Sequence, residues 1–387
     1  MSLSAVIKKK VPGFSLDVSI EEENEVMALL GSSGCGKSMT LMCIAGLMKP
    51  DEGRIVLNGR TLFDSEKKIN VPPQKRRIGY LFQQYALFPH MTVLQNVMAG
   101  VREGSRAQRR ERALREIHIF HMEDCMNQYP RELSGGQQQR CALARIFASD
   151  PELLLLDEPF SALDDALKWQ LEMEMSDVIR KGAMETIFVS HSQEECLRLC
   201  DSVSGIDNGR NEKKVSAAEM YSHPRTRTAA MLSGYRNIAG ARAADSAHAL
   251  FVPEWDAVLK SAYEVPAETA FAGIRDASVY IAHKAERFSS HVQDVIDDKA
   301  EDLNSPVRYG SITRPFSKDS AKGDESPVNV LHAVVDRISV NTVTAVGIVR
   351  VGNGVFYLEK PRAEMAGLRS GDAVEIRIRP EDVLPLV

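Results

Sequence analysis

The eight residues 31–38, GSSGCGKS, constrain this chain more than any other feature and are called the phosphate loop below. They follow the apolar run EVMALL at 25–30 and precede a helical pattern at 39–47. Their three glycines allow successive backbone N–H groups to point at phosphate oxygens, at the positive end of a new helix. The spacing predicts a nucleotide-phosphate site in which Lys37 reaches the β- and γ-phosphates and Ser38 binds Mg²⁺. A glycine-rich turn without a ligand is the alternative.

A second segment, LLLLDEPFSALD at 153–164, supplies acidic groups. Its four leucines predict a buried strand that ends in two carboxylates. Asp157 is expected to hold Mg²⁺ through water, and Glu158 to orient and polarise an attacking water. Helix caps can look similar, so the segment gains its meaning from the phosphate loop upstream. Together the two segments predict phosphoryl transfer from a nucleotide.

Length and charge limit the remaining classes of protein. A chain of 387 residues is expected to form two or three domains. Its 48 Lys and Arg against 53 Asp and Glu give a net charge of −5, which argues against a nucleic-acid partner bound through a large basic surface. Apolar runs stay well short of the ~20 residues that cross a bilayer. We therefore expect a cytosolic protein, which could still sit on a membrane protein.

The first part of the chain, residues 1–230, predicts an α/β domain. Between about 84 and 150 the pattern is mainly helical, which predicts a helical subdomain. Elsewhere strand-like apolar runs alternate with helical patterns, as in a parallel sheet that is covered on both faces. These runs lie at 26–30, 55–57, 78–82, 153–156 and 186–190.

The second part, residues 231–387, predicts a β-rich domain with a polar linker at about 300–327. Short alternating segments lie at 273–283, 328–338, 342–350 and 373–379. With turn signals such as Gly-Asn-Gly at 352–354, they predict a small β-barrel or sandwich. GIRDASVYIA at 273–282 and EIRIRPEDVLPLV at 375–387 share Ile-Arg, a polar turn and an apolar strand. This internal similarity is explained either by two related β modules or by a chance repeat.

Three further motifs point to one family. LSGGQQQR at 133–140 resembles the signature of ATP-binding-cassette (ABC) ATPases, and YLFQQYALFPHMTV at 80–93 resembles the glutamine loop of their importer branch. VSHSQEE at 189–195 resembles the switch region, with a histidine after a strand. The motifs occur in the family's order, and the resemblance covers about residues 1–235.

The resemblance implies an α/β P-loop NTPase cassette, with a RecA-like core plus a helical subdomain, that binds ATP and Mg²⁺. It implies Glu158, His191 and Gln83 as catalytic residues and Ser38, Gln83 and Asp157 as metal-binding residues. Two copies would form a head-to-tail dimer that closes on ATP and reopens after hydrolysis. The implied nucleotide-binding residues are Gly31, Ser32, Ser33, Gly34, Cys35, Gly36, Lys37, Ser38 and Met39 of one copy and Ser134, Gly135, Gly136 and Gln137 of the other, with Asp164 connecting the two sites.

The sequence departs from the family pattern in four places. The family usually has an aromatic residue about two dozen positions before the phosphate loop, and Phe14 lies closer, where a strand core residue is expected. Met39 stands where Thr or Ser is common, Gln84 where an acidic residue is frequent, and Ser192 where Asp often follows the switch histidine. None of these departures removes a predicted catalytic group.

The segments NGRTLFDSEKK and PPQKRRIGY within 53–90 are most similar to the ATP-binding subunit of molybdate importers, as are residues 160–175 and 237–275. That resemblance implies transmembrane permease subunits, indirectly a substrate-binding protein, and a peripheral place on the cytoplasmic face of the membrane. It also implies C-terminal modules of the OB-like (TOBE/Mop) type that regulate transport. Importers of sulfate, iron(III), polyamines or sugars, a non-transport ABC ATPase, and an oxyanion sensor in the C-terminal part are the alternatives.

Overall fold

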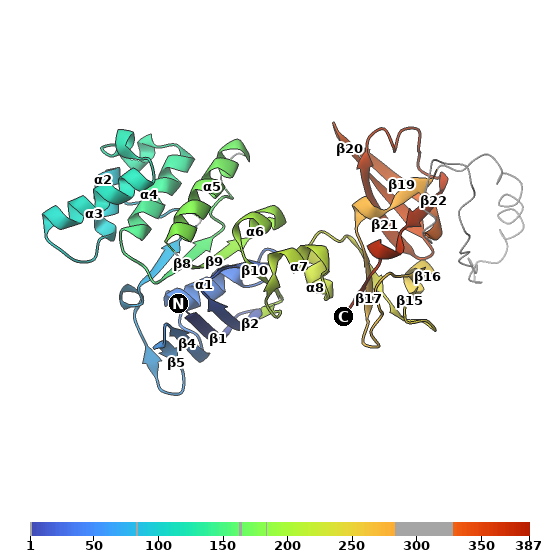
Figure 1. Cartoon of the computed structure of the whole chain (residues 1–387), viewed down its shortest axis with the longest axis horizontal. Coiled ribbons are helices and arrows are strands. Elements are labelled where there is room, and N and C mark those ends of the chain that lie inside the picture. Colours follow the sequence, from blue (N-terminus) through green and yellow to red (C-terminus); the bar gives the residue numbers. More distant parts are fainter. Residues whose placement is uncertain (1, 83, 162–164, 183, 283–327) are drawn as a thin grey trace, which may run out of the picture. The chain divides into compact units, whose positions relative to one another are not determined.

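The computed structural model describes residues 2–82, 84–161, 165–182, 184–282 and 328–387. It divides the chain into two compact units, Met1–Tyr221 and Ser222–Val387 (Figure 1). We call them the first and the second unit and describe each by itself. The expected polar linker at 300–327 lies outside the described residues.

The centre of the first unit is a run of five parallel strands. Their order is β10 (Ser202–Asp207), β3 (Val26–Leu30), β9 (Glu185–Ser190), β8 (Leu153–Asp157) and β7 (Ile78–Leu81). Every residue of β3, β8 and β9 is buried, as the continuous apolar runs predict. Leu30 pairs with Ser190 and Asp157 with Val189, so the carboxyl ends of these three strands lie level. The loops that follow them therefore meet at one edge of the sheet.

An antiparallel region continues this sheet on one side. It contains β1 (Ser2–Val11), β2 (Phe14–Glu23), β4 (Glu52–Leu57), β5 (Arg60–Asp64) and β6 (Ile69–Asn70). The expectation that residues 55–57 form a parallel strand is wrong, because β4 runs antiparallel to both β1 and β5. The two-residue turn between β4 and β5 joins antiparallel strands only, whereas a parallel connection needs a long crossover. The short strands β11 (Arg210–Asn211) and β12 (Val215–Ser216) pair with β10.

Helices of the first unit fall into two groups. The helical region contains α2 (Val93–Gly100), α3 (Arg106–Ile119) and α4 (Gly135–Phe147), which pack on one another (Figure 1). The others are α1 (Lys37–Ala45), α5 (Asp165–Lys181), α6 (Gln193–Leu199) and α7 (Ala217–Ser222). Among the described residues, no helix has the length and apolar character that a membrane span requires.

The second unit is built from antiparallel sheets around one large and one small apolar cluster. One sheet has the order β13 (Asn237–Gly240), β17 (Phe271–Ile274), β23 (Leu384–Leu386), and another β14 (Arg242–Ala243), β15 (Ala249–Val252), β16 (Ala257–Lys260). The largest has the order β18 (Tyr280–Ala282), β22 (Ala373–Ile378), β19 (Asn329–Val340), β20 (Thr344–Val351), β21 (Gly354–Pro361). The C-terminal region is therefore β-rich, as its alternating segments predict.

The boundary between the units lies earlier than residue 230. Helix α8 (Arg227–Leu232) groups with the second unit, because Ala230 packs against Tyr235, Leu384 and Leu386. The apolar side of this short helix is thus covered by strands of the C-terminal region.

The internal similarity between 273–282 and 375–387 has a structural counterpart. Each segment forms a strand, a short 3₁₀ turn and a second strand, first as β17 and β18 and later as β22 and β23. The two copies pair reciprocally, because β17 pairs with β23 and β18 with β22, all antiparallel. The shared Ile-Arg and polar turn therefore mark the same local structure in both places.

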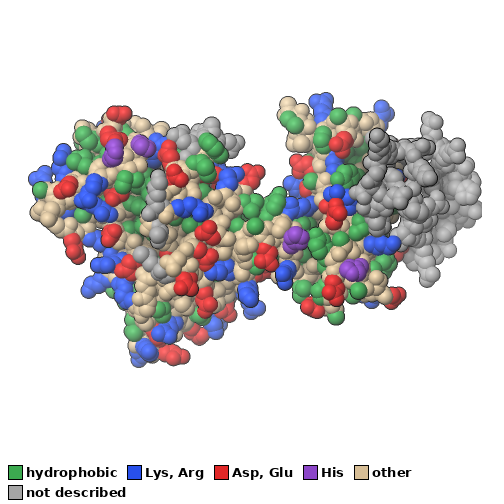
Figure 2. Space-filling view, viewed as in Figure 1, with side chains coloured by type: hydrophobic (Ala, Val, Ile, Leu, Met, Phe, Trp, Pro, Cys, Tyr) green, Lys and Arg blue, Asp and Glu red, His purple; other side chains and the backbone are tan. Residues whose placement is uncertain are grey.

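Charged side chains of both signs are interspersed over the visible face of each unit (Figure 2). This pattern agrees with the small net charge of −5.

Candidate functional site

The phosphate loop connects the end of β3 to the start of α1, in the strand–loop–helix order that the sequence predicts. Gly34 and Gly36 adopt left-handed conformations with φ of 79° and 113°, which side chains with a Cβ rarely adopt. A Cβ on Gly36 would also lie 2.6 Å from Leu16 Cδ1 and 3.1 Å from Phe14 Cζ. Glycine at position 36 therefore lets the helix start close against β2.

Lys37 is the first residue of α1, and its side chain is turned back into the loop. Its Nζ donates hydrogen bonds to the carbonyls of Gly31 (2.8 Å) and Ser32 (2.9 Å), and the residue is only 4% exposed. The thiol of Cys35 lies 3.9 Å from the same ammonium. Burial raises the pKa of Cys35, while the charge of Lys37 partly opposes that shift. The loop thus surrounds one buried positive charge.

Asp157 ends β8, and both oxygens of its carboxylate accept hydrogen bonds. Ser38 Oγ donates to Asp157 Oδ1 at 2.9 Å, and the Tyr80 hydroxyl donates to Oδ2 at 2.9 Å. Burial, then the charge of Asp157, raise the pKa of Tyr80, which keeps its hydroxyl a donor at neutral pH. Sequence reasoning missed Tyr80. The available signal was a phenol at the end of an apolar strand, where a polar group needs a partner.

Oxygen donors at this edge suit a magnesium ion. The Ser38 hydroxyl and the Asp157 carboxylate are in hydrogen-bond contact, and they come from the phosphate loop and from the neighbouring strand end. Mg²⁺ prefers hard oxygen ligands of this kind beside phosphates. The residues present therefore fit the metal that the sequence predicts.

Glu158 and His191 lie against each other at the same edge of the sheet. His191 Nε2 contacts the Glu158 carboxylate at Oε1, and His191 Nδ1 lies 3.1 Å from the Gly31 carbonyl oxygen. Glu158 has a φ of 49°, and its N–H donates to Val189 of β9 at 3.0 Å. This left-handed turn directs the chain away from the strand just after Asp157. His191 thus bridges the phosphate loop and Glu158.

The signature segment forms the start of α4. Ser134 is its N-cap, with its Oγ accepting from Gln137 N at 3.3 Å and its own N–H donating to Gln137 Oε1 at 2.9 Å. Gly135 is the first helical residue, and both Ser134 and Gly135 are exposed. Helix α4 packs with α2 and α3 (Figure 1). Within the described part of one chain, the hydrogen bonds around Lys37 do not include the signature residues.

The other predicted residues of the site have varied surroundings. Ser32, Ser33 and Gly34 are exposed in the phosphate loop, whereas Met39 is half-buried against the core. Phe14 also packs against this core, which agrees with its expected role as a strand core residue. The remaining two, Gln83 and Asp164, lie outside the described residues.

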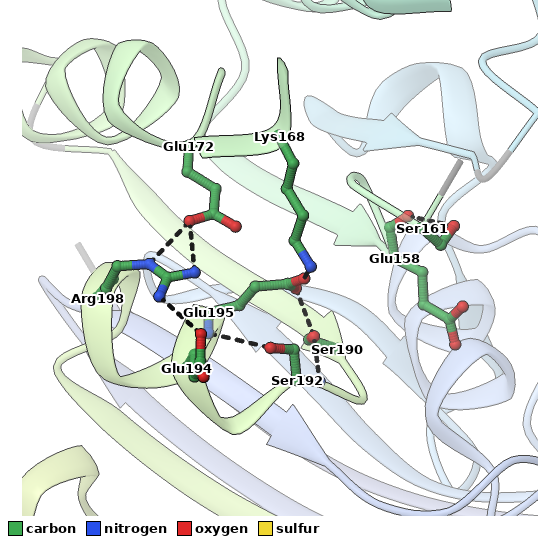
Figure 3. A network of polar contacts seen from close by, with 9 residues as sticks. All are labelled: Glu158, Ser161, Lys168, Glu172, Ser190, Ser192, Glu194, Glu195 and Arg198. Carbon is green, nitrogen blue, oxygen red and sulfur yellow. Dashed lines mark hydrogen bonds and ion pairs between the residues drawn. The ribbon is translucent and has the colours of Figure 1, made fainter. Parts of the chain in front are cut away.

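Ser192, where the family often has Asp, is the N-cap of α6. Its Oγ accepts from Glu195 N at 3.3 Å. Serine and aspartate are equally good N-caps, so this departure keeps the local structure. Figure 3 shows Ser192 together with its polar neighbours on β9, α5 and α6.

Comparison with known proteins identifies relatives. The family model described as ABC transporter matches residues 15–161. The spermidine/putrescine import ATP-binding protein PotA of Bacillus cereus is 38% identical over 230 residues, which cover 59% of this chain and 68% of the relative. CysA of Synechocystis, a sulfate/thiosulfate import ATP-binding protein, is 40% identical over 211 residues (54% and 58%). ModC of Paramagnetospirillum magneticum, a molybdenum import ATP-binding protein, is 38% identical over 204 residues (53% and 56%). The matches to CysA and ModC thus span less than two thirds of those proteins.

Proposed function

The chain belongs to the ATP-binding proteins of ABC transporters, an ATP-hydrolysing family that uses Mg²⁺, and we propose that this chain is the ATPase subunit of an importer. One observation carries the proposal. The Ser38–Asp157 hydrogen bond and the contacts of His191 with Glu158 and Gly31 gather three motifs at one sheet edge. These motifs are separate in sequence, and phosphoryl transfer needs all of them together.

Each residue has a chemical task in this proposal. Lys37 exchanges its loop carbonyls for the β- and γ-phosphate oxygens of ATP. Glu158 accepts a hydrogen bond from the attacking water and takes its proton, a step that contributes on the order of 10²–10⁴-fold to the rate. His191 holds the Glu158 carboxylate and stands beside the γ-phosphate. Mg²⁺, held by Ser38 and Asp157, supplies charge neutralisation when it is bound.

A second copy of the chain completes the proposed site. The exposed Ser134 and Gly135 stand at the start of α4, where a hydroxyl and backbone N–H groups are available to a phosphate. In a head-to-tail dimer, the segment Ser134, Gly135, Gly136 and Gln137 of each copy contacts the γ-phosphate held by the other. Gln83 and Asp164 are proposed to connect the site to the transporter and to the second site.

The test of the ATPase proposal is Glu158→Gln. Because the amide cannot accept the water's proton, ATP turnover is expected to fall by about 10²-fold or more, while ATP binding persists and the closed dimer accumulates. Steady-state ATPase assays, equilibrium binding and size-exclusion chromatography with ATP measure these three effects. Glu152→Gln is the matched control, because Glu152 pairs with Arg60 and Arg77 beside the opposite end of β8. A wild-type chain that does not hydrolyse Mg²⁺-ATP as a dimer contradicts the proposed function, and normal turnover in Glu158→Gln removes Glu158 from the base role.

For the transported substrate we propose an oxyanion, with molybdate or tungstate first. The resemblance of residues 53–90, 160–175 and 237–275 to molybdate importers supports this choice, and the similarity to ModC is consistent with it. Sulfate and polyamines are the competing candidates, because CysA and PotA are similar to the same degree. Uptake of molybdate, sulfate and putrescine into vesicles that contain the chain with its permease separates the three. Uptake of sulfate or putrescine alone overturns the molybdate proposal and leaves the importer proposal standing.

The proposed partners are transmembrane permease subunits and, through them, a substrate-binding protein. The chain would then lie at the cytoplasmic face of the membrane as a peripheral subunit. The second unit is proposed to regulate transport as OB-like (TOBE/Mop-type) modules, which its antiparallel sheets and reciprocal strand pairing support.

A further inference from the structure

We propose that Glu195 and Lys168 are positioning residues that hold His191 in place and connect it to α5, an inference that rests on the proposed function. Glu195 lies on α6 and Lys168 on α5, and neither is among the residues that face the nucleotide in the site described above. Figure 3 shows both side chains meeting beside Ser190, which ends β9 and directly precedes His191 in the chain.

Glu195 fixes the residues on both sides of His191. Ser190 Oγ donates to Glu195 Oε2 at 2.5 Å and accepts from Ser192 N at 2.8 Å. The backbone N–H of Glu195 in turn donates to Ser192 Oγ at 3.3 Å. Ser190 is 2% and Glu195 5% exposed, so water does not compete freely for these groups. The backbone that carries His191 is therefore held before and after the histidine.

Lys168 connects this arrangement to another part of the chain. Its Nζ pairs with Glu195 Oε1 at 2.5 Å, so the two carboxylate oxygens have different partners. Helix α5 begins at Asp165, soon after Glu158 in the chain. Contacts therefore run from Lys168 through Glu195 to Ser190, the residue before His191, and His191 itself contacts Glu158. A displacement of α5 is thus expected to move the His191 ring that contacts Glu158.

A second ion pair between the same helices provides a matched comparison. Arg198 on α6 donates from Nε to Glu172 Oε2 at 2.8 Å, and its Nη2 lies 2.8 Å from the same oxygen. Both carboxylates are buried, with side-chain exposures of 0% for Glu172 and 7% for Glu195, while their basic partners Arg198 and Lys168 are 34% and 24% exposed. Its contacts run between α5 and α6 without involving residues 190–192 (Figure 3). Both pairs link α5 to α6, but only Glu195 also contacts the residues beside His191. Comparing variants of the two pairs therefore distinguishes an effect on helix packing from an effect on the position of His191.

The experiment compares Glu195→Ala with Glu172→Ala in the full chain. Glu195→Ala is expected to lower kcat for ATP about 10- to 100-fold, because misplacing a catalytic group by about 1 Å costs on this order, with the KM for ATP within about twofold. Ser190→Ala and Lys168→Met each remove one partner and are expected to lower kcat less. Glu195→Gln keeps an acceptor for Ser190 and is expected to recover part of the rate. Glu172→Ala is expected to lower the melting temperature and leave kcat unchanged.

A spectroscopic readout decides the question without relying on turnover. The imidazole ¹⁵N signals of His191, assigned with His191→Asn, are expected to shift in Glu195→Ala and to stay in place in Glu172→Ala. Unchanged His191 signals in Glu195→Ala, or equal loss of kcat in both alanine variants, overturn the positioning role. An inactive wild-type chain contradicts the proposed ATPase function instead, and the His191 signals still decide whether Glu195 positions the ring.

Discussion

Buried polar side chains are arranged differently in the two units of the chain. In the first unit, Lys37 bonds to carbonyls of its own phosphate loop, and Asp157 and Glu195 bond to side chains of other segments. All three residues lie at or beneath one edge of the sheet. In the second unit, Asn237 and Asn329 bond to backbone groups of neighbouring strands. These three residues of the first unit thus belong to one candidate site, whereas the two asparagines of the second unit join strands.

The side-chain amides of the two asparagines in the second unit bond to backbone N–H and carbonyl groups, as a neighbouring strand would. Asn329 accepts from Lys260 N at 2.7 Å and donates to Lys260 O at 2.9 Å and to Ile378 O at 3.2 Å. Asn237 makes the same pair of bonds to the N–H and carbonyl of Tyr357, at 2.6 and 2.9 Å. Because every one of these bonds satisfies backbone, the comparison teaches that buried polarity marks a reactive site only where side chains from several loops converge.

Among the tests of this comparison between the units, the largest effect is expected from Lys37→Ala at the candidate ATP site. The change removes the buried ammonium that is proposed to bind the phosphates. Charged hydrogen bonds are worth about 2–3 kcal/mol in total here, so ATP affinity is expected to fall about 30- to 150-fold. Isothermal titration calorimetry measures the affinity. Lys49→Ala, at an exposed lysine beyond the other end of α1, is the control and should bind ATP normally. Unchanged affinity in Lys37→Ala contradicts the assignment of this lysine.

In the second unit, Asn329→Ala is expected to lower stability and to leave ATP turnover unchanged. The change leaves the N–H and carbonyl of Lys260 and the carbonyl of Ile378 without their side-chain partner, at a cost of about 3 kcal/mol in the free energy of unfolding of this unit. Turnover of folded protein is expected to stay constant. In a Trp169→Phe background, the buried Trp255 reports urea unfolding of the second unit by its fluorescence.

The matched control for this change is Asn353→Ala, at an exposed turn between β20 and β21. Its unfolding midpoint should equal that of the parent protein. If Asn329→Ala lowers ATP turnover without a change in the unfolding midpoint, the second unit contributes to the chemistry, and the contrast between the two units disappears.

Local sequence patterns were enough to locate the strands and the phosphate loop of the candidate site. The apolar runs and the glycine spacing put β3, α1 and β8 within a few residues of their observed bounds, because each pattern reports on its own segment. Strand β21 was missed, since Val355 and Tyr357 on its exposed face are as apolar as the residues on its buried face. The direction of β4 was also wrong, because an apolar run carries no information on strand polarity.

Contacts between segments that are far apart in sequence could not be predicted from local sequence patterns. Tyr80 and Asp157 are 77 positions apart, and nothing in either local pattern indicates their hydrogen bond. The proposed roles of Gln83, His191 and the signature segment rest on family resemblance, because a single histidine or glutamine has no distinctive spacing. The link between Lys168 and Glu195 likewise depends on how α5 and α6 pack, which only the folded chain shows.

A buried carboxyl of the first unit belongs to neither of these two arrangements. Glu22 is 3% exposed, and its Oε1 accepts from Thr186 N at 3.2 Å, at the end of β9 opposite the site. Burial, and then the charge of the fully buried Glu185, raise the pKa of Glu22 well above its ordinary value. This carboxyl neither assembles the site nor joins strands in the manner of Asn329, and its ionisation is expected to cost stability.

The smallest effect is predicted for Glu22→Gln, as a change in melting temperature. Because the folded pKa of Glu22 lies above the unfolded one, the folded state binds more protons between the two values, and the free energy of unfolding falls as pH rises through that interval. The amide keeps an acceptor for Thr186 and carries no charge, so the variant is expected to melt about 2–4 °C higher near pH 7.5. The gain should vanish below about pH 4, where the unfolded carboxyl is also protonated. Glu21→Gln, at the exposed neighbour, is the control and is expected to show no gain in melting temperature at either pH. A gain in Glu22→Gln that persists at pH 4 would show that packing rather than charge limits the stability of this part of the first unit.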